Sequence, residues 1–183
     1  MNVITTPFEG LLILEPRVFG DDRGYFFESF NEQVFVQNTG FTHRFVQDNQ
    51  ARSVKNVLRG LHYQNDPIPQ SKLIRCLQGA IWDVVVDLRR DSKTYKQWYG
   101  IELSDTNKLQ FLIPRGFAHG YSVLSDTSEV FYKCDNFYSK EDEGGVLYND
   151  PELAIDWKID LDDAIISDKD KVQPLFRDCN SRF

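Results

Sequence analysis

Alternation of side-chain type with a period of two is the feature that most constrains how this 183-residue chain folds. Between Ala80 and Leu88 every even-numbered position is apolar, whereas the odd-numbered positions mix aliphatic residues with Asp83 and Asp87. Successive side chains of a β-strand point to opposite faces. We therefore expect a strand here, with one face on an apolar core and the other towards a polar cavity.

Short segments of the same kind recur along the chain and are separated by turn signals rich in glycine. Many short strands at regular spacing predict a β-sandwich or a barrel. Besides Ala80–Leu88, the expected strands are Leu11–Leu14, Tyr25–Ser29, Phe45–Asp48, Val57–Tyr63, Lys72–Leu77, Tyr99–Leu103, Gln110–Ile113, Gly120–Val123 and Val130–Asp135.

Helix is expected to be scarce. Asn31 is a good helix cap with Glu32 in the first turn, which predicts a short helix that ends near Gln37. The acidic segment after Trp157 is expected to hold one or two helical turns. Without repeats or a linker, residues 1–183 are expected to form a single domain with a short C-terminal helical tail.

Charge and composition exclude several classes of function. A formal net charge of −7 argues against a broad nucleic-acid surface but leaves room for a small anionic ligand held by local arginines. No apolar run is long enough to span a membrane, and the start of the chain does not resemble a signal peptide. The three cysteines have no close spacing, which favours a reducing compartment, and we expect a cytoplasmic protein.

The chain has only three histidines, His43, His62 and His119. A lone histidine is usually a hydrogen-bonded structural residue, and His43 has no polar context that would suggest more, so we expect it at the surface. His62 follows Gly60, which permits close backbone approach, and Arg59 lies nearby. These neighbours favour a functional role for His62.

Strict alternation through Val57–Gln64 predicts the orientation of these side chains. It puts His62 on the same face as Gly60 and Gln64, and Arg59 on the opposite face.

The pattern Pro114-x-Gly116-x-x-His119 resembles the second conserved motif of the cupin superfamily. The first motif would then lie around Gly60–Gln64, where Gln64 replaces the second histidine of metal-binding cupins. Two histidines without an obvious carboxylate partner are a poor ligand set for a catalytic metal. The resemblance implies an all-β, cupin-type double-stranded β-helix (jelly-roll) barrel with a few short helices, and we expect no metal.

Further segments narrow the resemblance to one family. They are Phe19-x-Asp21-x-Arg23-Gly24-x-Phe26-x-Glu28-Ser29-Phe30, Phe45–Asn49, Val57–Gln64, Lys72–Cys76, Asp83–Arg89, Ile113–Gly120, Tyr132-Lys133, Asn149-Asp150 and Ser167–Asp170. In this order and spacing the chain resembles the dTDP-4-dehydrorhamnose 3,5-epimerases over nearly its whole length. The resemblance implies a dTDP-linked 4-keto-6-deoxy sugar as substrate, no cofactor, and a homodimer. One departure is Tyr148, where the family usually has Trp; we expect it to alter packing more than chemistry.

Inverting C3 and C5 of a 4-keto sugar requires a base on one face, a donor at O4 and an acid on the other face. The resemblance assigns these roles to His62, Lys72 and Tyr132. From the residues alone, Lys72 could equally be an exposed lysine and Tyr132 a core aromatic. A carboxylate should orient His62: the family pattern points to Asp170, and Asp83 is equally compatible with the sequence.

The remaining expected contacts are to the nucleotide sugar. Arg23 and Arg59, and as a further candidate Arg115, are suited to the diphosphate because arginine forms a fork that fits phosphate oxygens. Tyr138 resembles the residue that stacks on the base. The other residues that match the family's binding pattern are Phe26, Glu28, Gln47, Asn49, His119, Glu143 and Lys169. In this family the first strands pair with a partner subunit, so Arg23, Phe26 and Glu28 are expected to act across a dimer interface.

Three other functions stay open at this point. A related enzyme could invert only C3 or only C5, or act on another nucleotide's sugar. A non-catalytic sugar-nucleotide-binding cupin would not need His62, Lys72 and Tyr132 together. A metal-dependent cupin enzyme would purify with stoichiometric metal.

Overall fold

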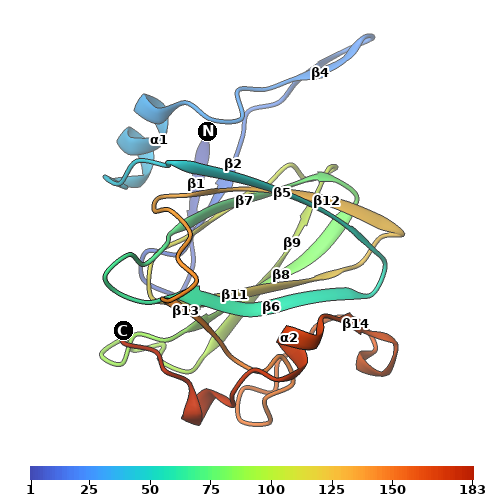
Figure 1. The fold of residues 1–183 in the computed structure, drawn as a ribbon. Helices are drawn as coiled ribbons and strands as arrows, with labels where there is room; N and C mark the ends of the chain where they lie inside the picture. The colour runs from blue at the N-terminus through green and yellow to red at the C-terminus, as the bar shows by residue number, and fades with distance from the viewer.

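The computed structural model describes all residues 1–183, and two β-sheets that face each other make up most of it (Figure 1). In spatial order the first sheet contains β1 (Asn2–Thr5), β2 (Leu12–Glu15), β10 (Gln110–Ile113), β7 (Lys72–Gln78), β12 (Thr127–Cys134) and β5 (Gln47–Val54). The second contains β13 (Glu143–Gly145), β6 (Val57–Gln64), β11 (Phe117–Val123), β8 (Ala80–Asp87) and β9 (Trp98–Ser104), and β14 (Ile165–Ile166) also pairs with β6. The predicted all-β jelly-roll is confirmed.

Outside the two sheets, β3 (Phe19–Asp21) and β4 (Gly24–Phe26) form a hairpin that pairs with no other strand. Figure 1 shows it extending away from the two sheets.

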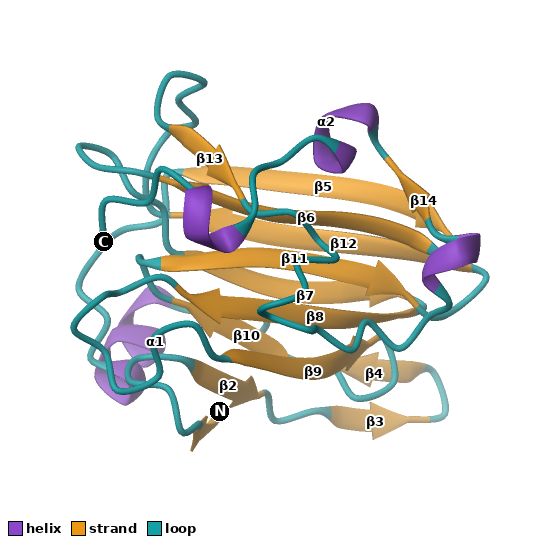
Figure 2. Ribbon diagram, turned by 90° about the horizontal axis from the view of Figure 1, so that it is seen from below, coloured by secondary structure: helices purple, strands orange, loops and turns teal.

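The helices are few and short, as predicted. Helix α1 (Glu32–Thr39) begins where the Asn31 side chain accepts a hydrogen bond from Val34 N at 3.2 Å. It ends at Thr39, with Gly40 as its cap, slightly later than the sequence predicts. The C-terminal segment contains α2 (Asp168–Lys171) and two 3₁₀ turns, η1 (Leu161–Asp163) and η2 (Phe176–Asp178). Figure 2 shows this segment lying across the outer face of the second sheet.

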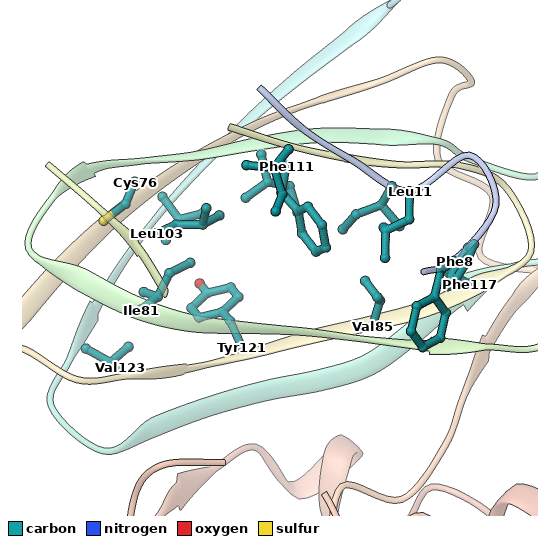
Figure 3. Packing of buried hydrophobic residues seen from close by; sticks show 14 residues of the cluster. Phe8, Leu11, Cys76, Ile81, Val85, Leu103, Phe111, Phe117, Tyr121 and Val123 are labelled. Carbon is teal, nitrogen blue, oxygen red and sulfur yellow. The ribbon is translucent and has the colours of Figure 1, made fainter. Parts of the chain in front are cut away.

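The core has two parts, one on each side of the second sheet. Between the sheets, Ile81 and Val85 pack with aromatic and aliphatic residues from both layers (Figure 3). On the outer face, Val84 and Val86 pack beneath the C-terminal segment, with Trp157 at the centre. The alternation in Ala80–Asp87 is therefore that of a β-strand, as predicted. Its wholly apolar face is the outer one, which the C-terminal segment covers.

The expected alternation through β6 is wrong at one point, because the strand contains an irregularity. His62 of β6 pairs with His119 of β11, and the next pair is Arg59 with Tyr121. Between these two pairs β6 therefore has one residue more than β11. Gly60 absorbs the shift with φ of 122°. A Cβ there would lie 2.6 Å from Gly120 Cα, so the close approach requires glycine. As a result Arg59 and His62 line the same cavity instead of opposite faces.

Some strand boundaries differ from the expectation. The strand expected at Phe45–Asp48 overlaps β5 only at Gln47 and Asp48, because β5 begins at Gln47 and runs on to Val54. The one expected at Tyr25–Ser29 begins at Gly24 and stops at Phe26. β5 carries mostly polar residues because its inward face borders a cavity, so its sequence lacks the apolar alternation of a core strand.

The helices of the structure are all too short or too polar to span a membrane.

Candidate active site

A histidine–carboxylate pair forms the centre of the site. His62 of β6 contacts Asp170 of α2, with 2.7 Å between His62 Nε2 and Asp170 Oδ1. The His62 side chain is 31% exposed and that of Asp170 only 4%. Of the two carboxylates that the sequence left open, Asp170 is therefore the one in contact with His62.

Two groups besides His62 hold Asp170 in place. Ser167 caps α2, where its Oγ accepts from Asp170 N at 3.1 Å. Gly60 N donates to Asp170 Oδ2 at 3.2 Å. Burial alone would raise the pKa of Asp170, but the hydrogen bonds from His62, Gly60 and Ser167 outweigh it and lower that pKa. The carboxylate thus stays ionised and can hold a proton on the facing imidazole nitrogen.

Asp83 belongs to a second, deeper pair with His119. Both oxygens of Asp83 lie 3.0 Å from His119 Nε2, and both residues are buried. The pair joins β8 to β11, whose register places Tyr121 opposite Asp83. Burial raises the pKa of Asp83 and lowers that of His119, each opposed by the other group's charge.

Lys72, the first residue of β7, lines the same cavity as His62 and His119, and its charge acts on the His119–Asp83 pair. Burial lowers its pKa, and Cys134, Asp83 and Glu143 only partly oppose this. A partly desolvated ammonium of this kind interacts strongly with any negative charge that develops beside it.

Tyr132 reaches the same space from β12 in the first sheet, whereas His62 and His119 come from the second. Burial raises its pKa to about 12, so the phenol keeps its proton at neutral pH. It lies in register with Asn49 of β5 and Ile74 of β7.

Two adjoining cavities surround these residues and share His62, Lys72 and Tyr132. The larger, which we call the inner cavity, measures about 540 Å³, and the smaller, the outer cavity, about 290 Å³. The inner cavity is also lined by Ala51, Val57, Leu58, Arg59, His119, Gly120, Tyr121, Ile165, Ile166, Ser167, Lys169 and Asp170. The outer cavity is also lined by Gln47, Asn49, Tyr63, Gln64, Gln70, Cys134, Tyr138 and Glu143.

A chain of hydrogen bonds orders the outer cavity. Tyr138 Oη donates to one oxygen of Glu143 at 3.0 Å, and Lys169 Nζ donates to the other at 2.5 Å. Gln47 accepts from Tyr138 N at 3.0 Å and donates to Asn49 Oδ1 at 3.0 Å. The Tyr138 ring itself is exposed, which leaves its face open to a flat ligand group.

Arg59 is the one arginine among the lining residues. Its Nε donates to the buried Ser53 Oγ at 3.1 Å, and the residue is otherwise exposed. Arg115, the further candidate for the diphosphate, instead pairs at 3.0 Å with buried Asp135 and lines neither cavity. Tyr148 packs against the outer core, and its backbone carbonyl accepts from Trp157 Nε1.

Three of the expected binding residues lie away from this centre. Arg23 is at the tip of the β3–β4 hairpin, its side chain 90% exposed and paired only with Asp21. Phe26 is 71% exposed. With Glu28, these residues line separate hollows around the hairpin and α1. His43 is exposed, as expected.

Sequence reasoning missed Tyr121, which lines the inner cavity, and Ser53, which holds the Arg59 side chain of that cavity. Tyr121 looks like one aromatic among many in a strand, and only the irregularity at Gly60 places it beside Arg59. No group of three or more His, Cys, Asp or Glu residues lies close enough together to hold a metal ion.

Comparison with known proteins gives a consistent result. A family model described as dTDP-4-dehydrorhamnose 3,5-epimerase matches residues 5–178. The Escherichia coli (strain K12) dTDP-4-dehydrorhamnose 3,5-epimerase is 53% identical over 171 residues, which cover 93% of this chain and 92% of that protein.

Solved structures are equally similar. The crystal structure of dTDP-4-dehydrorhamnose 3,5-epimerase from Elizabethkingia anophelis superposes with a TM-score of 0.93 at 54% identity, covering 97% of both chains. A Legionella pneumophila 3,5-epimerase, solved in complex with dTDP-4-keto-L-rhamnose, has a TM-score of 0.92 at 47% identity, covering 96% of this chain and 93% of that one.

Proposed function

The chain belongs to the dTDP-4-dehydrorhamnose 3,5-epimerase family, and we propose that its inner cavity holds the sugar of this family's substrate and its outer cavity the nucleotide. The chain is an isomerase of dTDP-L-rhamnose biosynthesis, which epimerises dTDP-4-dehydro-6-deoxy-D-glucose at C3 and C5 to give dTDP-4-dehydro-L-rhamnose.

His62 is the base that removes a proton from the carbon next to the C4 ketone. The observation that carries this role is its 2.7 Å contact with ionised Asp170 at the wall of the inner cavity. Because that contact engages Nε2, it keeps the ring proton there and leaves Nδ1 free to accept the substrate's proton. The carboxylate then stabilises the imidazolium that forms.

Loss of the proton turns the ketone into an enolate, whose charge collects on O4. Lys72 stabilises this charge, since its ammonium lies in the same cavity and is poorly solvated. Tyr132 returns a proton to the opposite face of the same carbon, because it approaches from the other sheet. The same three groups serve C3 and C5, which both adjoin the C4 ketone, and the reaction needs no cofactor.

The remaining lining residues bind the substrate. Arg59 faces the diphosphate, with its free guanidinium edge directed by Ser53. His119 borders the sugar, and Tyr138 stacks on the base. The other residues of the nucleotide end are Gln47, Asn49, Glu143 and Lys169.

The active form is a homodimer in which the β3–β4 hairpin of one protomer reaches the site of its partner. The support is the position of Arg23 and Phe26, which are highly exposed and unpartnered by the rest of their own chain. Exposed aromatic and arginine side chains are typical of interface anchors. We place the protein in the cytoplasm, where its three free cysteines would stay reduced.

Incorporation of solvent deuterium at C3 and C5, followed by NMR, tests the proposed roles. Wild-type protein should label both carbons of the thymidine-linked substrate; label at one carbon only would contradict double epimerisation. His62→Ala should abolish labelling while folding and dTDP binding persist, and His43→Ala, at an exposed histidine, serves as the matched control.

Tyr132→Phe separates proton loss from proton return. The variant should wash isotope out of the substrate faster than it forms product, because the phenol acts only in reprotonation. Normal turnover by Tyr132→Phe would show that Tyr132 is not the acid that returns the proton.

A further inference from the structure

Tyr121 carries a buried hydroxyl that makes no hydrogen bond with the rest of the protein. The residue is only 5% exposed, and its Oη makes no hydrogen bond. Figure 3 shows the side chain pointing from β11 into the space between the two sheets. A buried polar group without a partner costs free energy, so such groups usually meet a water or a ligand.

The position of this hydroxyl relates it to the inner cavity. Tyr121 lines that cavity together with His62, Lys72 and Tyr132. It follows His119 by two residues on β11, and the two rings are 6.5 Å apart between centroids. Burial raises the pKa of Tyr121, and the nearby Ser53 and Arg59 lower it by less. The hydroxyl therefore stays protonated and can donate a hydrogen bond.

The polar groups nearest Tyr121 make their hydrogen bonds elsewhere. Ser53 lies close enough to lower the pKa of Tyr121 but bonds Arg59 Nε rather than Tyr121 Oη, and both oxygens of Asp83 contact His119. The lining of the inner cavity also includes Ala51 and Val57, whose side chains offer no acceptor.

We propose that the Tyr121 hydroxyl donates a hydrogen bond to the C2 or C3 hydroxyl oxygen of the bound hexose and is a specificity residue of this enzyme. The inference rests on the proposed function, which puts the hexose in the inner cavity. The hexose is favoured over the diphosphate because of depth: Arg59 is exposed at the cavity mouth, whereas Tyr121 is buried beside His119. The ketone oxygen is engaged by Lys72, which leaves the two hydroxyls as acceptors.

Tyr121→Phe tests the proposal, since it removes only the hydroxyl. Folding should be unaffected or slightly stabilised, because the lost group has no protein partner. Affinity for dTDP, which lacks the hexose, should stay unchanged. The kcat/KM for the 4-keto sugar should fall roughly tenfold, as expected for one lost hydrogen bond to substrate.

Deoxy substrates identify the partner of the hydroxyl. Wild-type protein should lose about the same tenfold factor with either the 2-deoxy or the 3-deoxy hexose, measured as deuterium exchange at C5, and Tyr121→Phe should lose nothing further with that analogue. An equal penalty in both proteins for both analogues would overturn the proposal. A matching loss of dTDP affinity in Tyr121→Phe would overturn it as well, because the contact would then be to phosphate.

Ser128→Ala is the matched control. Ser128 Oγ is also buried and unpartnered, but Ser128 lines neither cavity, so kcat/KM should not change. An equal fall in Ser128→Ala and Tyr121→Phe would mean that buried hydroxyls act through the fold, which would overturn the proposal. Failure of wild-type protein to exchange deuterium at C3 and C5 would instead refute the proposed function itself.

Discussion

Asp170 is the residue on which the chemistry of His62 depends most directly. In Asp170→Asn the amide group can present its N–H to His62 Nε2, which moves the imidazole proton to Nδ1 and blocks the base. We expect kcat to fall by roughly 10²–10⁴-fold, with dTDP affinity unchanged, as measured by steady-state kinetics and calorimetry.

Asp168→Asn is the control for this change, because Asp168 lies in the same helix but is fully exposed and pairs only with Lys171. It should behave like wild-type protein. A fully active Asp170→Asn variant would show that the carboxylate does not orient His62.

Lys72 should set the alkaline limit of activity. Burial holds its pKa below the ordinary 10.5, so its charge is lost at lower pH than in an exposed lysine. Tyr132 has its pKa raised to about 12 and is still protonated where Lys72 loses its charge. The fall of kcat/KM with rising pH should therefore begin below pH 10.5 and report Lys72.

Lys72→Arg tests the assignment, since arginine keeps its charge above pH of about 12. The variant should be slower but lack the alkaline fall, whereas Lys133→Arg, on the neighbouring strand, should keep it. An unchanged alkaline limb in Lys72→Arg would assign that limb to another group.

At the scale of elements, the contact between β6 and β11 shapes the inner cavity. Gly60 and Gly24 both have φ near 125°, but only at Gly60 would a Cβ meet backbone, 2.6 Å from Gly120 Cα. Gly24→Ala should cost only the strain of the backbone, about 1–2 kcal/mol. Gly60→Ala should lower the free energy of unfolding by more than about 3 kcal/mol, as measured by urea denaturation. If Gly60→Ala and Gly24→Ala lowered the free energy of unfolding by the same amount, β6 and β11 would be able to move apart without cost.

The same irregularity marks how far elements can be predicted from sequence. Core strands such as β7, β8 and β10 are predicted closely because buried apolar residues occupy most of their positions. The short strands β1, β3, β13 and β14 were not predicted, since two to four residues carry too little pattern. The extra residue in β6 left no signal in residue type beyond Gly60 itself.

At the scale of the whole molecule, the site draws on segments that are distant in sequence. Asp170 and His62 are separated by 108 residues, and periodicity gave no reason to prefer Asp170 to Asp83. Packing of the C-terminal segment against β6 separates the two carboxylates into different pairs. Sequence motifs could thus indicate which residue types the chemistry uses, but partners such as Asp83 for His119 depend on the register of strands.

The assembly offers the last test, because a site shared between two protomers can be rebuilt from two defective ones. Suppose that the Arg23 side chain of one protomer completes the site that contains His62 of the partner subunit. A hybrid of a His62→Ala protomer with an Arg23→Ala protomer then has one site with both defects and one site with neither. After random mixing, half of the dimers are hybrids, so about a quarter of wild-type activity should return.

If Arg23 instead acted within its own chain, every site of the hybrid would keep one defect, and mixing would restore nothing. Mixing His62→Ala with Asp170→Asn is the control, because these two residues are in contact within one chain, and no intact site can form. Recovery in the first mixture and not in the second would require the β3–β4 hairpin to complete the partner's site. That arrangement also accounts for an exposed hairpin that carries Tyr25 and Phe26 into solvent in the single chain.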